Sequence, residues 1–270
     1  MSYYKFIDLF AGIGGIRLGF EQAFKKNSET VFVSEWDEYT QKTYKANFES
    51  PKEIAGDITK INEKEIPTFD ICLAGFPCQA LSMAGQRKGF DDNYKGACRG
   101  TLFLDVARIC EEHKPKVIFC ENVKGLTIHD KGRTFKIIKS TFENLGYNVF
   151  SQILNSRDFG VPQNRERIYI VCFRKDLEIE EFNFPKSTDS TKTIRDILEE
   201  NLVSAKYYLS TTYIETLKRH KERHEAFPDS YKLVLADTHL YKQFGNSVSV
   251  PIIAAIAGEI KKKLAKSEEK

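Results

Sequence analysis

The sequence lacks the patterns that mark several classes of protein. In its 270 residues no stretch reaches the ~18 consecutive apolar residues of a membrane-spanning helix, and the longest, residues 248–257, is interrupted by Ser249 and Pro251. Only 16 glycines and 8 prolines are present, which excludes collagen-like and low-complexity chains. Basic and acidic residues nearly balance, 41 against 38, and 41% of residues are apolar, which excludes an intrinsically disordered chain. The sequence therefore predicts a globular protein of one large domain, with or without a small appendage.

Cysteine is also scarce, and its spacing indicates neither zinc nor disulfides. The six cysteines form no C-x-x-C pair and no Cys/His spacing typical of a metal site. Cys72, Cys120 and Cys172 lie within apolar runs, so they are predicted to be buried free thiols. The N-terminus has neither the apolar run nor the cleavage site of a signal peptide, so we expect a reducing, cytoplasmic location. A net charge of +3 does not by itself indicate nucleic-acid binding.

Short apolar runs alternate with amphipathic segments between residues 3 and 173. The predicted strands are Tyr4–Leu9, Val31–Ser34, Phe69–Ala74, Lys116–Cys120, Asn148–Leu154 and Arg167–Phe173. The predicted helices between them are Ile16–Lys26, Glu38–Asn47, Thr101–Glu112 and Thr134–Asn144. This alternation predicts a mainly parallel sheet with helices on both faces, that is, a doubly wound α/β fold.

The composition changes after Phe173. Residues 174–192 are polar, and within them residues 186–192 are predicted to form a linker. Short helices are predicted at residues 193–200 and 211–224, and a last helix at Val250–Ala265. The run Lys218–His224 is basic, and a solvated helix face is favoured there over a phosphate contact.

A glycine-rich turn follows the first predicted strand and opens a helix, at the position where open α/β sheets bind ligands. The turn contains Phe10, Ala11, Gly12, Gly14 and Gly15. Glycine allows the backbone to turn sharply and to approach a ligand closely. The pattern is not G-x-G-x-x-G, so it does not indicate a pyrophosphate.

Polar and aromatic residues follow the next two predicted turns of the fold. Glu35 can accept hydrogen bonds from ribose hydroxyls, and Trp36 can stack on an adenine. In the segment that contains Asp57 and Ile58, the Asp57 carboxylate can accept a hydrogen bond from the adenine amino group. Taken singly, these features are typical of a helix cap, a core aromatic or a tight turn. Together, at successive strand ends, they favour an adenosine-type cofactor without a pyrophosphate, and S-adenosyl-L-methionine fits this description.

An exposed thiol is predicted where Gly75, Phe76 and Pro77 lead from a strand into Cys78. A loop continues from there to about residue 99, and its glycines at positions 85, 89 and 96 predict that it can move. A thiol there is a candidate nucleophile if Arg165, Arg167 or a sulfonium lowers its pKa. Glu121 follows the adjacent predicted strand. Alone it is typical of a solvated loop, but paired with Cys78 it indicates an acid that faces a substrate.

With these residues in view, the chain resembles the DNA (cytosine-5) methyltransferases of bacterial restriction-modification systems. The resemblance covers residues 3–174 and again about 227–260. It rests on ordered motifs: residues 10–15 for the cofactor, Pro77-Cys78-Gln79, Glu121-Asn122-Val123, Gln163–Arg167, and Gln243–Val248. The resemblance implies a Rossmann-like S-adenosyl-L-methionine-dependent methyltransferase fold.

The resemblance also implies the role of each site residue. Cys78 adds to C6 of a cytosine flipped out of double-stranded DNA, and Glu121 acts at N3. Arg167 contacts the base carbonyl, and Arg165 lies near the nucleophile or the backbone. The implied cofactor residues are Phe10, Ala11, Gly12, Gly14, Gly15, Glu35, Trp36, Asp57, Ile58, Gly75, Pro77, Leu102, Asn246, Ser247 and Val248. The implied substrate residues are Gln79, Ser82, Asn122 and Val123.

The chain departs from the family where a target-recognition region is expected. Only about fifty positions, residues 175–226, are available for it, near the lower bound for a domain. We therefore expect a catalytic and cofactor-binding domain at 1–174, a linker with a vestigial recognition region at 175–236, and a C-terminal segment at 237–270 that returns to the catalytic domain. Two alternatives remain open: a tRNA cytosine-C5 methyltransferase, or a catalytically weak S-adenosyl-L-methionine-binding core that needs a partner chain for DNA recognition.

Overall fold

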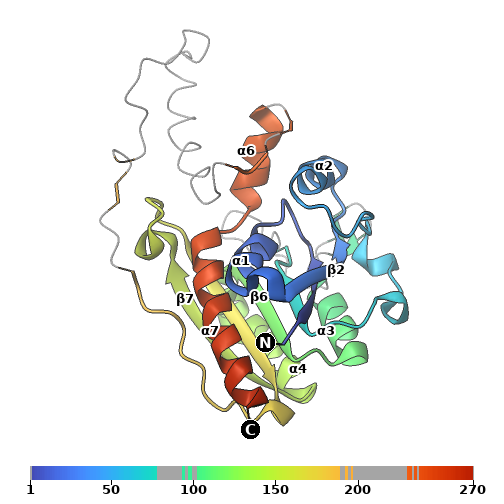
Figure 1. The fold of residues 1–270 in the computed structure, drawn as a ribbon, viewed down its shortest axis with the longest axis vertical. Coiled ribbons are helices and arrows are strands. Elements are labelled where there is room, and N and C mark those ends of the chain that lie inside the picture. Colours follow the sequence, from blue (N-terminus) through green and yellow to red (C-terminus); the bar gives the residue numbers. More distant parts are fainter. Residues whose placement is uncertain are drawn as a thin grey trace.

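A six-stranded sheet forms the centre of the molecule in the computed structural model (Figure 1). The structure describes residues 2–77, 102–188 and 237–269, together with the short pieces 93–94, 97–98, 192–193, 196, 230–232 and 234–235. Cys78, Gln79 and Ser82 lie outside the described residues, as do the helix expected at 211–224 and most of that expected at 193–200.

The strands occur in the order β2-β1-β3-β6-β8-β7. Their bounds are β1 Tyr4–Leu9, β2 Ser28–Ser34, β3 Ile71–Ala74, β6 Val117–Val123, β7 Tyr147–Asn155 and β8 Glu166–Arg174. Parallel pairing joins β1 to β2 and β3, and β3 to β6, whereas β8 runs antiparallel to both β6 and β7. The expected mainly parallel sheet is confirmed, with β8 as its reversed strand. A separate pair, β4 Asn93–Tyr94 and β5 Ala97–Cys98, is antiparallel.

Helices cover both faces of the sheet (Figure 1). Helices α1 (Gly15–Phe24) and α7 (Val250–Glu268) pack on one face, and α3 (Leu102–His113) and α4 (Arg133–Asn144) pack on the other. Successive side chains of a strand point to opposite faces, so Phe6 joins the α1 and α7 side while Ile7 joins the α3 and α4 side. Both faces of the sheet are therefore apolar, as expected for strands covered by helices.

A smaller core joins the C-terminal part of the chain to the cofactor turn. Helix α2 (Glu38–Asn47) contributes Tyr44, and Leu240 and Phe244 come from α6 (Asp237–Asn246). The Thr43 hydroxyl donates to the side-chain oxygen of Gln243 at 2.9 Å, which links the two helices directly. Helix α6 was not among the predicted helices, because its sequence is polar apart from these few apolar positions.

Short 3-10 helices connect the larger elements. They are η1 Lys25–Asn27, η2 Ile58–Lys60, η3 Glu63–Glu65, η5 Lys124–Thr127, η6 His129–Gly132, η7 Ser156–Phe159 and η8 Lys175–Leu177. All six predicted strands of the main sheet and the predicted helices on its faces are present, with ends that differ by a few residues. Strand β6 extends through Glu121, so this residue belongs to a strand rather than to a solvated loop.

Part of the polar stretch that precedes the predicted linker is packed against the sheet. Ile179 and Phe182 are buried against the sheet, and the Asn148 side chain donates to the carbonyl oxygen of Ile179 at 3.0 Å. Phe182 also contacts the rings of Phe150 and Phe173. These isolated apolar positions form no periodic pattern in the sequence, but the aromatic side chains on one face of β7 and β8 pack against them.

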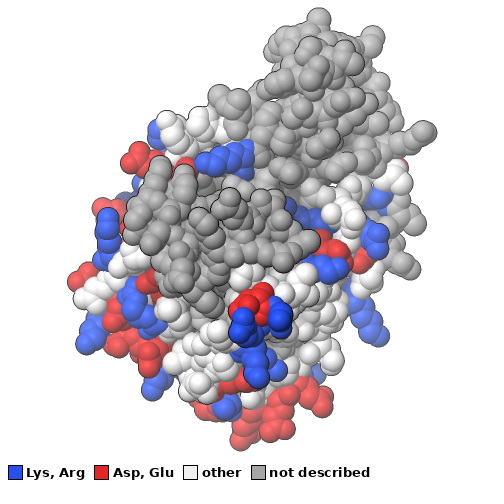
Figure 2. All heavy atoms as spheres, turned by 180° about the vertical axis from the view of Figure 1, so that it is seen from behind, with Lys and Arg blue, Asp and Glu red and all other residues white. Residues whose placement is uncertain are grey.

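The described residues agree with two of the expectations from composition. The thiols of Cys72, Cys110, Cys120 and Cys172 are free and buried. Figure 2 shows acidic and basic side chains of the described residues interspersed on one face of the molecule, as the near balance of charge predicts. In the part of the chain that the structure describes, no helix is long and apolar enough to cross a membrane, and no cluster of three or more His, Cys, Asp or Glu could hold a metal ion.

Candidate active site

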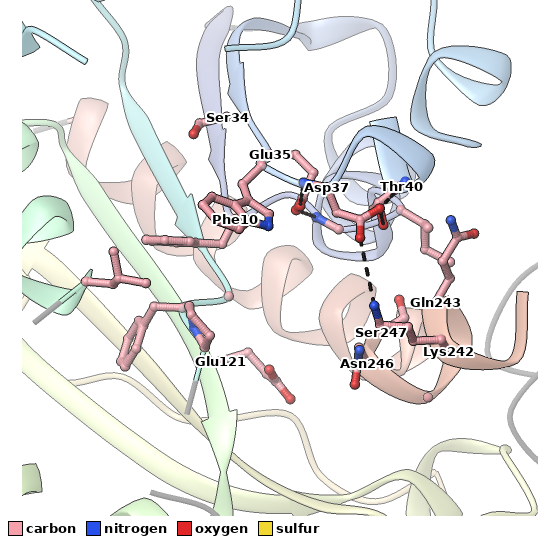
Figure 3. A pocket seen from close by; sticks show the side chains of 18 of the residues that line it. Phe10, Ser34, Glu35, Asp37, Thr40, Glu121, Lys242, Gln243, Asn246 and Ser247 are labelled. Carbon is pink, nitrogen blue, oxygen red and sulfur yellow. Dashed lines mark hydrogen bonds and ion pairs between the residues drawn. The ribbon is translucent and has the colours of Figure 1, made fainter. Parts of the chain in front are cut away.

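A pocket of about 710 Å³ lies at the carboxyl ends of β1, β2, β3 and β6 (Figure 3). This volume lies in the usual range for small-molecule sites, roughly 300–1,000 Å³. Figure 3 shows Glu35, Asp37 and Thr40 along one side, with Asn246 and Ser247 across from them. The pocket therefore brings the ends of successive strands together with the C-terminal part of the chain.

Two of the glycines in the first turn, Gly12 and Gly14, differ in what surrounds them. Gly12 (φ +56°) lines the pocket and donates its N–H to Glu35 Oε2 at 2.8 Å, and a Cβ there would meet nothing within 4 Å. Gly14 (φ +82°) lies instead under the ring of Phe48, where a Cβ would come within 2.2 Å of Cε2. Gly12 is therefore open to a ligand, whereas Gly14 permits close packing of the turn against α2.

Glu35 presents a constrained carboxylate to the pocket. Its Oε1 accepts the N–H of Asp37 at 2.8 Å, in addition to the Gly12 contact at Oε2. Burial raises the pKa of Glu35, and these N–H donors partly oppose the rise. Each oxygen retains a lone pair for a ligand hydroxyl. The neighbouring Trp36 is 53% exposed and lines the pocket, so it offers an apolar face to a flat ring.

Asp57 and Ile58 form the next wall. Partial burial raises the pKa of Asp57, but hydrogen bonds from the Thr59 hydroxyl and N–H outweigh it and leave the pKa below its ordinary value. The group is therefore an ionised acceptor. Arg108 of α3 donates to the carbonyl oxygens of Ile58 and Ile61 at 3.0 and 2.9 Å, which holds this wall in place.

The other end of the pocket contains an acid paired with an arginine. Arg167 Nε lies 3.2 Å from Glu121 Oε1, and Glu121 is only 8% exposed. Burial raises the pKa of Glu121, while the charges of Arg167 and Arg165 oppose the rise. Asn122 donates its side-chain amide to the carbonyl oxygen of Phe76 at 3.2 Å, which ties β6 to the chain that leads toward Cys78. This end therefore places a buried acid, with its pKa raised above the ordinary value, beside a fixed positive charge.

Helices α2 and α6 close the pocket with contacts that the sequence motifs did not indicate. The Tyr39 and His239 rings stack at 4.4 Å, and Lys242 Nζ lies 3.9 Å from Asp37 Oδ2, the contact dashed in Figure 3. The pocket residues that lie outside the motifs are Ser34, Asp37, Tyr39, Thr40, His239 and Lys242. Ile13, Gly56, Phe76, Gln243 and Gly245 lie within or beside the motifs but were not predicted as site residues. Adjacency to Glu35 could have identified Asp37, but no local pattern indicates His239 or Lys242.

The structure brings most of the predicted site residues together. Those that line the pocket are Phe10, Gly12, Glu35, Trp36, Asp57, Ile58, Gly75, Pro77, Leu102, Glu121, Asn122, Val123, Arg165, Arg167, Asn246 and Ser247. Those that do not line it are Ala11, Gly14, Gly15 and Val248, which are buried in the packing around it or are covered by neighbouring side chains. For these four, motif membership reflects how the turn and α7 pack rather than an exposed contact surface.

Known proteins with similar sequences are methyltransferases. A family model described as C-5 cytosine-specific DNA methylase matches residues 4–226 and 222–262. The type II methyltransferase M.HpaII of Haemophilus parainfluenzae is 43% identical over 333 aligned residues, which cover 97% of this chain and 90% of that protein. The type II methyltransferase M.HhaI of Haemophilus parahaemolyticus is 38% identical, with coverage of 95% and 94%.

Solved structures share the fold at lower sequence identity. The methyltransferase EhMeth of Entamoeba histolytica superposes with a TM-score of 0.75 at 19% identity and full coverage of both chains. The S. pombe Dnmt2 methyltransferase gives a TM-score of 0.71 at 17% identity, with coverage of 96% of this chain and 99% of that chain.

Proposed function

Because this chain belongs to the C-5 cytosine-specific DNA methylase family, we propose that it methylates C5 of cytosine in DNA through a covalent bond between Cys78 and the base. Members of the family are enzymes that use S-adenosyl-L-methionine. The observation that carries the proposal is the buried Glu121–Arg167 pair, which shares one pocket with Glu35 and Trp36.

The residues of the pocket fit S-adenosyl-L-methionine. Glu35 and Asp57 offer acceptors, Trp36 offers a flat apolar face, and Asn246 and Ser247 offer polar groups on the opposite side. Because Gly12 has no side chain, the pocket beside it stays open for a ligand, whereas a larger residue there would place its side chain in that space. When bound, the cofactor supplies an electrophilic methyl group for C5 of the base.

The protein's own residues make C5 reactive. C5 of cytosine is a poor nucleophile, so the Cys78 thiolate adds to C6 and turns the C5–C6 bond into an enamine-like nucleophile. Glu121, with its raised pKa, donates to N3 and balances the electron density that develops there. After C5 is methylated, loss of the C5 proton expels the Cys78 thiolate and restores the aromatic ring.

Arg167 orients the acid and the base in this proposal. Its Nε pairs with Glu121 and its Nη1 donates to the carbonyl oxygen of Glu166 at 2.8 Å, so the N–H groups of Nη2 are the ones that face the base carbonyl in this proposal. Glu121 is almost fully buried at the inner end of the pocket, so a base stacked in a duplex cannot reach it. The target cytosine must therefore be flipped out of the helix.

We also propose that target recognition depends on a second chain. The two family matches meet at residues 222–226, and the alignment with M.HpaII has 63 more positions than this chain has residues (333 − 270). The additional positions of M.HpaII support a reduced recognition region in this chain. We place it within residues 175–236, between a catalytic domain at 1–174 and a returning segment at 237–270. Base contacts to neighbouring nucleotides then have to come from elsewhere.

Methyl transfer from labelled S-adenosyl-L-methionine to duplex DNA, tRNA and a sample without nucleic acid tests the substrate class. We expect label in DNA only. Label in tRNA alone would assign the RNA-directed alternative, and label in neither would leave a cofactor-binding core.

The nucleophile is tested with DNA that contains 5-fluorocytosine, because fluorine at C5 cannot leave as a proton does. We expect the wild type to form a denaturation-resistant adduct, and Cys78→Ser to form none while it binds cofactor nearly as well as the wild type. An equal yield of adduct from both proteins would contradict the assignment of Cys78.

A further inference from the structure

Arg165 connects β8 to the C-terminal motif across 80 residues of sequence. Its guanidinium donates to the carbonyl oxygen of Gly245 at 3.4 Å and also to that of Ser247. These two residues flank Asn246, whose side chain lies in the pocket. Arg165 therefore contacts the backbone on both sides of a pocket residue.

The backbone of Arg165 is itself held at both of its polar groups. Its N–H donates to Asn155 Oδ1 at 3.1 Å, and its carbonyl oxygen accepts the N–H of Ser156 at 3.1 Å. Asn155 and Ser156 lie at the end of β7 and are buried, and the Asn155 amide also donates to Asn164 Oδ1 at 2.7 Å. The guanidinium thus projects from a fixed point of the central sheet.

The guanidinium is well suited to this task. It is planar, always charged and able to donate in parallel, so it can hold two carbonyl oxygens at a set separation, whereas a lysine ammonium is a point charge on a flexible stem. Arg167, two residues along the chain, pairs instead with the carboxylate of Glu121. The two arginines therefore make different hydrogen-bonded contacts, although the charges of both act on Glu121.

We propose that Arg165 is a positioning residue for the cofactor motif, which it fixes at Gly245 and Ser247 so that Asn246 faces S-adenosyl-L-methionine. This inference rests on the proposed function only in taking that cofactor as the pocket's ligand. Arg165 is then assigned to the positioning of the cofactor motif, whereas the sequence placed it near the nucleophile or the backbone. The contact with Glu121 is then made by Arg167, and Arg165 contributes only its charge there.

Calorimetric titration with S-adenosylhomocysteine tests the inference without requiring catalysis. We expect Arg165→Met to weaken binding by roughly 10- to 100-fold, the scale of lost hydrogen bonds from a charged group, and Arg165→Lys to weaken it less. Arg157→Met is the matched control, because Arg157 is 65% exposed and pairs only with the neighbouring Asp158 among the described ion pairs. It should bind as the wild type does. Thermal unfolding of each variant confirms that it is folded, and Arg165→Lys provides the test if Arg165→Met does not fold.

A double-mutant cycle with Asn246→Ala separates positioning from direct contact. If Arg165 acts through Asn246, the double variant Arg165→Lys/Asn246→Ala binds no more weakly than Asn246→Ala alone, whereas additive losses would overturn the inference. In steady-state assays Arg165→Lys should raise KM for S-adenosyl-L-methionine with kcat largely kept, and Arg167→Lys should lower kcat. A drop in kcat alone for Arg165→Lys would also overturn it. Failure of the wild type to methylate DNA would instead contradict the proposed function and leave the calorimetric result standing.

Discussion

Asp8 is a fully buried carboxyl on the strand that leads into the cofactor turn. Tyr44 donates its hydroxyl to Asp8 Oδ2 at 3.2 Å, and Arg17 Nη1 donates to the Tyr44 oxygen at 3.1 Å. Burial raises the pKa of Asp8 to about 8, although the Arg17 charge and the Tyr44 hydrogen bond oppose the rise. The folded protein therefore retains a proton on Asp8 that the unfolded chain releases.

This proton makes the stability contribution of Asp8 depend on pH with a definite sign. Between the ordinary value of 3.8 and the folded value of about 8, the unfolded chain binds fewer protons than the folded one, so stability falls as pH rises. Asp8→Asn has no proton to lose, so its free energy of unfolding should improve relative to the wild type as pH rises through this window. Urea denaturation of both proteins at several pH values measures the difference, and parallel pH profiles would contradict the assignment.

Glu35 is the residue for which the proposed cofactor contact is most direct, because its carboxylate lines the pocket. Glu35→Ala should weaken S-adenosyl-L-methionine binding by about 1.5–3 kcal/mol, the scale for a hydrogen bond to a charged group. Calorimetry measures this loss. Glu38→Ala is the control, because Glu38 is an exposed residue of the adjoining helix and should bind normally. Equal affinity of Glu35→Ala and the wild type would remove Glu35 from the cofactor site.

At the scale of the element, the turn between β1 and α1 separates a ligand-facing glycine from a packing glycine. Gly14→Ala places a side chain at φ +82° and within 2.2 Å of the Phe48 ring, so it should reduce the free energy of unfolding by about 2–4 kcal/mol. Gly12→Ala meets only the backbone strain at φ +56°, about 1–2 kcal/mol, but its methyl group enters the cofactor pocket.

Urea unfolding and cofactor titration of both glycine variants distinguish these effects. We expect Gly14→Ala to lose more stability and Gly12→Ala to lose more affinity. The reverse ranking would contradict the assignment of Gly12 to the pocket and of Gly14 to the packed side of the turn.

At the scale of the whole molecule, the C-terminal part of the chain contributes residues to the wall of the pocket. Helix α7 packs on α1, where Gly19 allows Ile253 to approach so closely that a Cβ would lie 2.5 Å from its Cγ2. The Tyr231 hydroxyl donates to the carbonyl oxygen of Ile13 in the cofactor turn. The pocket is therefore assembled from both ends of the sequence, independently of a large recognition region.

This architecture leads to a prediction about DNA. Phosphate contacts position a protein on DNA and base contacts specify the sequence, so a reduced recognition region should leave weak duplex binding with strong salt dependence and little sequence preference. Bisulfite sequencing of a mixed-sequence duplex after prolonged incubation measures the outcome. Efficient methylation of one tightly defined motif by this chain alone would show that residues 175–236 suffice for recognition.

The sequence by itself determined the sheet, its helices and much of the cofactor side of the pocket. Strands buried on both faces must be apolar throughout, so β1, β3 and β6 are recognisable locally. Functional groups of an open α/β sheet lie directly after its strands, so Glu35 and Trp36, which follow β2, could be identified from position, whereas Asp57 caps η2 and follows no strand of the sheet. Both properties depend on interactions within a short stretch of chain.

Only the tertiary structure decided which of several similar residues serve the site. Gly12 and Gly14 differ because the ring of Phe48 covers one and not the other. Arg165 and Arg167 lie two positions apart, yet one contacts carbonyl oxygens of a distant segment and the other contacts Glu121. Helix α6 is stabilised by burial against α2 rather than by a periodic apolar face of its own. In each case the deciding partner is far away in sequence, so no local pattern contains the information.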